Sequence, residues 1–202
     1  MKLRASDGKV LGTFTVGKSP WWLAFDGANI WTANYGDGTV SKVRASDGTV
    51  LGTFTVGTSP IGVAFDGSNI WVTNYGSNTV SKLRASDGAT LGTFGVGVNP
   101  LGIALDCANM WVGNRNDSSV SELRASDGKV LGTFSLGATG PYGLAFDGLN
   151  VWVAGDLDVY ELRASDGAVI GRFRPATPAT GIAFDGASVW VSILDDNSVS
   201  KY

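Results

Sequence analysis

The chain holds few residues that could catalyse a reaction by proton transfer. It has no histidine and one cysteine, Cys107, and its only glutamates are Glu122 and Glu161. Without histidine, neither a Ser-His-Asp nor a Cys-His arrangement can form, and the commonest metal ligand is absent. Any catalysis would have to rest on Asp, Lys, Arg, Tyr or Ser. We therefore predict a protein that is not an enzyme, with no cofactor and no metal.

Residues suited to binding a ligand are more plentiful. Asn and Asp side chains can hydrogen-bond to hydroxyl groups, and an aromatic face can pack against C–H groups, which together favour carbohydrate or another small polar ligand. The candidate ligand-binding residues are Trp21, Trp22, Tyr142, Arg115, Asn34, Asn74, Asn114, Asp156 and Asp195. The same residue types also build solvated turns, and that alternative stays open for each of them.

The elements that must position these residues are copies of one unit. The segment Arg-Ala-Ser-Asp-Gly begins at Arg4, Arg44, Arg84, Arg124 and Arg163, so the spacing is forty residues three times and then thirty-nine. A fixed period near 40 indicates one supersecondary unit repeated in tandem. We expect a single domain over residues 1–202, built from five repeats.

Each unit contains four short strand patterns. In the second unit, the apolar run 61–65 ends at the turn dipeptide Asp66-Gly67, and residues 70–73 are rich in β-branched and aromatic side chains. Residues 79–83 alternate as in a half-buried strand, and 90–94 form the fourth pattern. No window has helical periodicity. The sequence predicts an all-β, five-bladed β-propeller with four antiparallel strands in each blade.

Two recurring features are better explained by structure than by a site. The tryptophan on the second strand of every unit can fill the space between neighbouring blades, so we predict core packing. It occurs at Trp31, Trp71, Trp111, Trp152 and Trp190. The repeated Asp-Gly is turn chemistry, because single carboxylates spread around a ring cannot supply the 6–8 oxygen ligands of calcium.

The ends of the chain predict how the ring closes. The sequence starts at the end of a third strand, continues with a fourth strand over 9–16, and stops with a third strand over 197–202. The N-terminal strand can therefore complete the last blade and cover its exposed edge. Five strands of each kind balance a closed ring of five blades. The alternative is that the chain is part of a six- or seven-bladed protein, because a cyclically shifted set of whole repeats also contains equal numbers of each strand.

The repeats differ mainly on one face. The loops from fourth to first strands and from second to third strands share that face and vary most, as expected where function lies in loops on a rigid scaffold. Trp22 stands where the other copies have Gly62, Gly102, Gly143 and Gly181. We predict that Trp22 contacts a ligand at the mouth of the central channel, around which the blades of a propeller are arranged. The alternative is that it plugs the channel or packs on Trp21.

Composition limits the partners. The net charge is −3 with no basic run, which argues against nucleic acid. No apolar stretch approaches the roughly 18 residues of a membrane span. We expect a monomer whose partner is a carbohydrate, another small polar ligand or a protein, and the sequence assigns no compartment.

The unit Pro-x-Gly-Ile/Val-Ala-Phe-Asp-Gly, Ile-Trp-Val-Thr-Asn-Tyr-Gly, Thr-Val-Ser-Lys-Leu resembles YVTN/NHL-type propeller repeats, and most of all the branch of streptogramin lyase-like proteins. The resemblance covers essentially the whole chain. It implies a propeller, and for the lyases a metal-dependent elimination that opens a cyclic peptide lactone with a histidine base. This chain has no histidine, so none of those catalytic residues carries over.

Three functions remain open at this point. The first is a non-enzymatic propeller that binds a small polar ligand or glycan on the variable face. The second is a scaffold or protein-interaction propeller, including a fragment or a designed chain without a ligand. The third is a streptogramin-lyase-like enzyme, against which the lack of histidine argues. We favour the binding or scaffold class.

Overall fold

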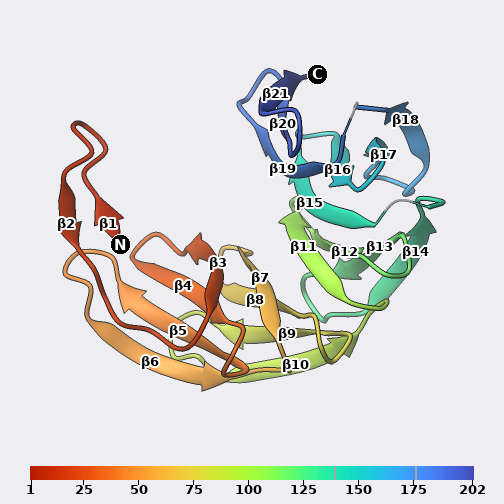
Figure 1. Ribbon diagram of the computed structural model, residues 1–202. Helices are drawn as coiled ribbons and strands as arrows, with labels where there is room; N and C mark the ends of the chain where they lie inside the picture. The colour runs from red at the N-terminus through yellow and green to blue at the C-terminus, as the bar shows by residue number, and fades with distance from the viewer. Residues whose placement is uncertain (139, 176) are drawn as a thin grey trace.

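The chain is built from β-strands that follow one another along an arc (Figure 1). The computed structural model describes residues 1–138, 140–175 and 177–202. Within these residues there are twenty-one strands and no helix. No helix in the described part of the chain is therefore long and apolar enough to cross a membrane.

The strands fall into four kinds by their place in the repeat. The first strands are β3 (Pro20–Phe25), β7 (Pro60–Phe65), β11 (Pro100–Leu105), β15 (Pro141–Phe146) and β19 (Ala179–Phe184). The second strands are β4 (Asn29–Asn34), β8 (Asn69–Asn74), β12 (Asn109–Asn114), β16 (Asn150–Gly155) and β20 (Val189–Ile193). The third strands are β1 (Lys2–Leu3), β5 (Thr39–Arg44), β9 (Thr79–Arg84), β13 (Ser119–Arg124), β17 (Val159–Arg163) and β21 (Ser198–Lys201). The fourth strands are β2 (Val10–Gly12), β6 (Val50–Thr55), β10 (Thr90–Gly95), β14 (Val130–Ser135) and β18 (Val169–Phe173).

Consecutive strands pair antiparallel into blades. Four blades are complete four-stranded sheets, β3–β6, β7–β10, β11–β14 and β15–β18. The terminal sheets have three strands, β19–β21, and two strands, β1–β2. This arrangement confirms the predicted all-β class and is consistent with a five-bladed propeller closed by its terminal strands. We number the blades 1 to 5 by their first strands, so that blade 1 begins with β3 and blade 5 begins with β19.

The Asp-Gly turn and the tryptophan of each unit form one local network. In blade 2 the carboxylate of Asp66 accepts hydrogen bonds from the backbone N–H of Asn69 (2.6 Å) and from Trp71 Nε1 (2.7 Å). Gly67 has φ +96°, in the region that glycine adopts without strain. Partial burial opposes the charged form of Asp66, but these hydrogen bonds lower its pKa. The network therefore fixes both the turn and the orientation of the indole.

The core lies between neighbouring blades. Trp71 of blade 2 is fully buried and packs with Ile103 and Leu123 of blade 3 in one cluster. In blades 1 and 2 a lysine above the tryptophan adds a polar link. Lys82 Nζ lies 5.1 Å from the Trp71 ring and donates to the carbonyl oxygens of Ala125 (2.6 Å) and Ser126 (3.1 Å). The predicted core role of the second-strand tryptophan is confirmed in blades 1 to 4.

The two ends of the arc differ from this pattern. Trp190 is 38% exposed, and in this structure β2 pairs with β1 alone, while β21 pairs with β20. Figure 1 shows the β1–β2 hairpin and the β19–β21 sheet at opposite ends of the arc. The sequence predicts five third strands, but the described residues form six, because β1 and β21 are both third strands of the repeat. The last blade is thus split between the two terminal sheets, and β2 and β21 are not paired with each other in this structure.

Candidate functional site

A cavity of about 540 Å³ opens on the variable face, where the first strands of the five blades converge. Every blade contributes to its lining. The residues are Trp21, Trp22, Tyr35, Ile61, Tyr75, Leu101, Arg115, Tyr142, Thr180, Gly181 and Ser192. They come from the start of the first strand and the end of the second strand in each unit, which are next to the two variable loop sets. The cavity therefore lies on the face where the repeats differ most.

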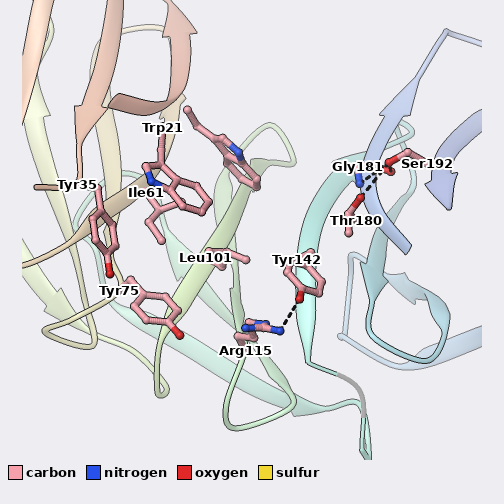
Figure 2. Close-up of a pocket in the computed structure, with 11 residues that line it drawn as sticks. Trp21, Tyr35, Ile61, Tyr75, Leu101, Arg115, Tyr142, Thr180, Gly181 and Ser192 are labelled. Atoms are coloured by element: carbon pink, nitrogen blue, oxygen red, sulfur yellow. Dashed lines mark hydrogen bonds between the residues drawn. The ribbon is translucent and has the colours of Figure 1, made fainter. Parts of the chain in front are cut away.

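Aromatic rings form one wall of the cavity. Trp21 and Tyr35 lie with their ring centroids 5.9 Å apart at an interplanar angle of 34°, and Tyr75 lies beyond them on blade 2 (Figure 2). Trp21 is 54% exposed, although Ile61 and Leu101 at the same position in blades 2 and 3 are buried. An exposed indole beside an exposed phenol offers an apolar platform with polar edges.

Trp22 stands where blade 2 has a closely packed glycine, Gly62. In blade 2 the backbone N–H of Gly62 donates to Thr73 Oγ1 (2.7 Å), and the same hydroxyl donates to the carbonyl of Leu101 (2.9 Å). A Cβ at Gly62 would lie 2.4 Å from that carbonyl oxygen. Blade 1 has Ala33 in place of Thr73, so this hydroxyl bridge is absent there. Trp22 is 37% exposed and lines the cavity.

Arg115 supplies the only cationic side chain among the lining residues. Its guanidinium donates to the hydroxyl of Tyr142, lies 4.4 Å from the centroid of that ring, and pairs with Asp156 at 3.5 Å. Partial burial opposes its charge, but Tyr142 and Asp156 raise the pKa of Arg115, so it is a permanent cation. Its Nε is buried without a hydrogen-bond partner among the described residues.

Hydroxyl groups form the wall opposite the aromatic residues. Thr180 and Ser192 of blade 5 face each other with their oxygens 3.1 Å apart, and the backbone N–H of Gly181 donates to Ser192 Oγ (2.8 Å), as Figure 2 shows. Hydroxyl oxygens can both donate and accept. The cavity thus has an aromatic wall, a cation at its centre and a neutral polar wall.

The three predicted asparagines do not reach this cavity. Asn34, Asn74 and Asn114 are fully buried. Asn74 donates to the hydroxyls of Thr79 (3.0 Å) and Ser81 (2.9 Å) within its own blade, and its carbonyl oxygen accepts from the backbone of Gly57 (3.0 Å). Burial leaves these amides no surface for a ligand, so their role is to hold the blade together. We remove them from the candidate site.

The two predicted aspartates lie in different places. Asp156 is half-buried and borders the cavity through its ion pair with Arg115. Asp195 is exposed on the loop of blade 5, where its backbone N–H donates to Thr177 Oγ1 (3.3 Å), and it does not line the cavity. No cluster of three or more acidic, cysteine or histidine side chains suited to a metal is present in the described part of the chain.

Sequence reasoning missed Tyr35 and Tyr75 as lining residues. Both occupy the position of Arg115 in their own units, directly after the buried asparagine. Aligning the repeats on Arg115 would have found them. Ser192 occupies the position of Thr73, and its hydroxyl accepts from the Gly181 N–H as that of Thr73 accepts from Gly62.

No protein-family profile matches the chain, and no curated protein is similar to it in sequence. Solved structures share its fold. Hydrazine synthase from Kuenenia stuttgartiensis matches with a TM-score of 0.77 at 20% identity over 91% of this chain and 58% of that one. A catalytically inactive histidine-to-alanine variant of virginiamycin B lyase from Staphylococcus aureus, with quinupristin, matches with a TM-score of 0.77 at 16% identity over 91% and 66%. U3-55K matches with a TM-score of 0.83 at 16% identity over 93% and 62%. The chain spans about three-fifths of the length of these proteins.

These similarities support a coarse conclusion. They confirm the predicted relation to β-propeller proteins, and at this identity they concern the fold alone. The narrower resemblance to YVTN/NHL repeats and to the lyase branch is not decided by them.

Proposed function

We propose that this propeller is a non-catalytic binding module that holds a small polar ligand, with carbohydrate as the class that fits best, in the cavity of the variable face. One observation carries the proposal. The repeats are nearly identical, yet positions at which they differ gather around one cavity. The clearest are Trp21, Trp22, Arg115 and Tyr142. A scaffold without a ligand has no reason to concentrate its exceptions there.

The lining residues suit both the apolar face and the hydroxyl groups of a sugar. The exposed ring of Trp21, next to Tyr35, suits the apolar face of a pyranose. The guanidinium of Arg115 and the hydroxyl of Thr180 suit its hydroxyl groups. A cavity of about 540 Å³ also lies within the range of roughly 300–1,000 Å³ that small-molecule sites have.

A lyase-like activity is the weaker alternative. We also propose that the repeats of this chain are related to YVTN/NHL-type repeats, a group that includes the streptogramin lyase-like branch. However, the virginiamycin B lyase with alanine in place of one histidine is catalytically inactive, and this chain has no histidine at all. A binding role needs no such residue.

The test is a titration of intrinsic tryptophan fluorescence with oligomers of glucose and of N-acetylglucosamine. We expect a saturable change with the parent protein and its loss in Trp22→Gly, which restores the residue of the other repeats. Leu157→Ser is the matched control, because Leu157 is exposed on a loop of the same face but does not line the cavity. Binding by Trp22→Gly with parental affinity would show that the site is misplaced. No response to either sugar series from the folded parent would favour the scaffold hypothesis.

A further inference from the structure

Arg115 gives the cavity of the variable face a fixed positive charge. Among the described residues that line the cavity, it is the one charged side chain. It stands where blades 1 and 2 have Tyr35 and Tyr75, so the exchange changes the charge of the cavity and not only its shape. A guanidinium is not deprotonated in proteins. Every ligand that enters this cavity therefore meets a cation.

The carboxylate next to Arg115 binds it loosely. Asp156 Oδ1 lies 3.5 Å from Nη2 of Arg115, whereas the other ion pairs of the described residues have N–O distances of 2.8 to 3.0 Å. The side chains of Arg115 and Asp156 are 32% and 38% exposed, so water reaches both. A long ion pair that water screens contributes little free energy. A carboxylate supplied by a ligand can therefore bind Arg115 beside Asp156 or in its place.

Tyr142 holds the guanidinium without cancelling its charge. The Tyr142 ring centroid lies 4.4 Å from Cζ of Arg115, and the hydroxyl oxygen accepts a hydrogen bond from Nη2. Burial first and the charge of Asp156 second raise the pKa of Tyr142. The phenol is therefore neutral near pH 7. It fixes the orientation of Arg115 and leaves the positive charge in place.

Acidic residues of the neighbouring loops lie outside the lining. Asp37 accepts a hydrogen bond from the backbone N–H of Lys18 (2.6 Å), and Asp117 accepts one from the backbone N–H of Val98 (2.5 Å). Neither carboxylate lines the cavity, and neither does that of Asp195. The net charge of −3 therefore comes from residues outside the lining, while the lining itself is positive.

The aromatic wall by itself would accept either sign of charge. An ammonium group can bind over the face of a tryptophan or tyrosine ring. Arg115 lies between Tyr75 and Tyr142 in the same cavity and repels such a cation (Figure 2). Among the described lining residues, no carboxylate offsets this repulsion. The cavity should therefore prefer an anionic sugar to a neutral one, and a neutral sugar to an amino sugar.

We propose that the ligand of this cavity is an acidic saccharide, in which the carboxylate of a uronic acid binds Arg115 and a sugar ring packs on the aromatic wall. This inference rests on the proposed function, because it names the class of sugar for the same site. Guanidinium and carboxylate groups are both planar and can form two parallel hydrogen bonds. Arg115 thus determines the specificity, whereas Trp21 and Trp22 supply a ring contact that acidic and neutral sugars share.

The test is isothermal titration calorimetry with β-1,4-linked oligomers of glucuronic acid and of glucose. At equal length the two series differ only in the group at C6, and β-1,4-linked oligomers of glucosamine form a cationic third series. We expect the parent protein to bind the acidic series about tenfold more tightly than the neutral one at low salt, which corresponds to about 1.4 kcal/mol. The cationic series should bind most weakly. Added sodium chloride should reduce the advantage of the acidic series, because salt screens partly exposed charges.

A pair of variants assigns the preference to one residue. Arg115→Gln removes the charge and keeps a hydrogen-bond donor. Arg124→Gln is the matched control, because Arg124 also pairs with an aspartate, Asp127 at 3.0 Å, but does not line the cavity. We expect Arg115→Gln to bind the acidic and neutral series alike and Arg124→Gln to keep the tenfold preference. Asp156→Asn removes the competing carboxylate and should increase the preference. Circular dichroism establishes that each variant is folded.

The outcomes separate this inference from the proposed function. Equal binding of the acidic and neutral series by the parent would overturn the inference and leave the proposed function standing. An acidic preference that persists in Arg115→Gln would overturn the inference as well, because the carboxylate would then bind elsewhere. Tightest binding of the glucosamine series would do the same, because the aromatic wall would then hold a cation. Binding of none of the three series by the folded parent would overturn both proposals.

Discussion

The polar link between blades gives the most direct prediction about stability. Lys82→Met keeps a side chain of similar length but removes the ammonium that donates to Ala125 and Ser126 at 2.6 and 3.1 Å. Hydrogen bonds to a charged group contribute about 1.5–3 kcal/mol each, and a cation on an aromatic ring adds about 0.5–2 kcal/mol. Burying the ammonium costs several kcal/mol in return. We expect a net loss of about 2 kcal/mol in the free energy of unfolding.

The assay is urea unfolding followed by far-ultraviolet circular dichroism. With a slope of about 2 kcal/mol per molar urea, the midpoint should fall by about 1 M. Lys129→Met is the matched control, since it makes the same change in charge at an exposed residue outside the junctions, and it should leave the midpoint in place. A Lys82→Met midpoint equal to that of the control would mean that the buried ammonium contributes nothing beyond the packing of its aliphatic part.

Two further substitutions restore the residue found in other repeats, and both should stabilise the protein. Glu122 occupies the position of Lys82 in blade 3, where burial first and the charge of Asp106 second raise its pKa. Because the folded pKa is above the unfolded one, the ionised form opposes folding. Glu122→Lys should therefore add about 1 kcal/mol at pH 7 and less as the pH falls and the parental carboxyl takes up a proton. Unfolding curves at pH 7 and pH 4 would check this, and an equal gain at both would contradict it. Cys107 has φ +110° where the other repeats have glycine, so Cys107→Gly should add about 1 kcal/mol after the greater entropy of the unfolded glycine is subtracted. A lower urea midpoint for Cys107→Gly would show that this backbone is not strained.

The repeat pattern predicted the blade well because it is reinforced at several levels. Asp66 and Trp71 stand five residues apart in the unit, and the spacing serves one hydrogen bond that joins a turn to a core side chain. Alternation in 79–83 marked the third strand but predicted half-burial wrongly, because residues 80–83 are all buried. Each copy repeats the same information, so a weak local signal becomes a strong one. Trp190 departs from the pattern because the blade that would cover it is divided between the two ends of the chain.

The candidate site was predicted less well, and the asparagines show why. Asn74 was selected for its residue type and its place beside a loop, but it ends β8 and bonds to Ser81 within its own sheet. It is also identical in three repeats. Identity across three copies indicates a role that these blades share, which is a structural role. Arg115 and Trp22 differ from their counterparts and do line the cavity. In a chain of near-identical units, the exceptions carry more information about binding than the residue types do.

The same near-identity limits what sequence can say about closure. Lys2 and Lys201 both fit the third-strand pattern, and both fit the register opposite Gly12. Pattern and register decide which position a strand takes in a blade, but not which copy takes it. The choice depends on differences between the complete strands: β21 extends over four residues and its sheet carries Trp190, whereas β1 has two residues and no tryptophan partner.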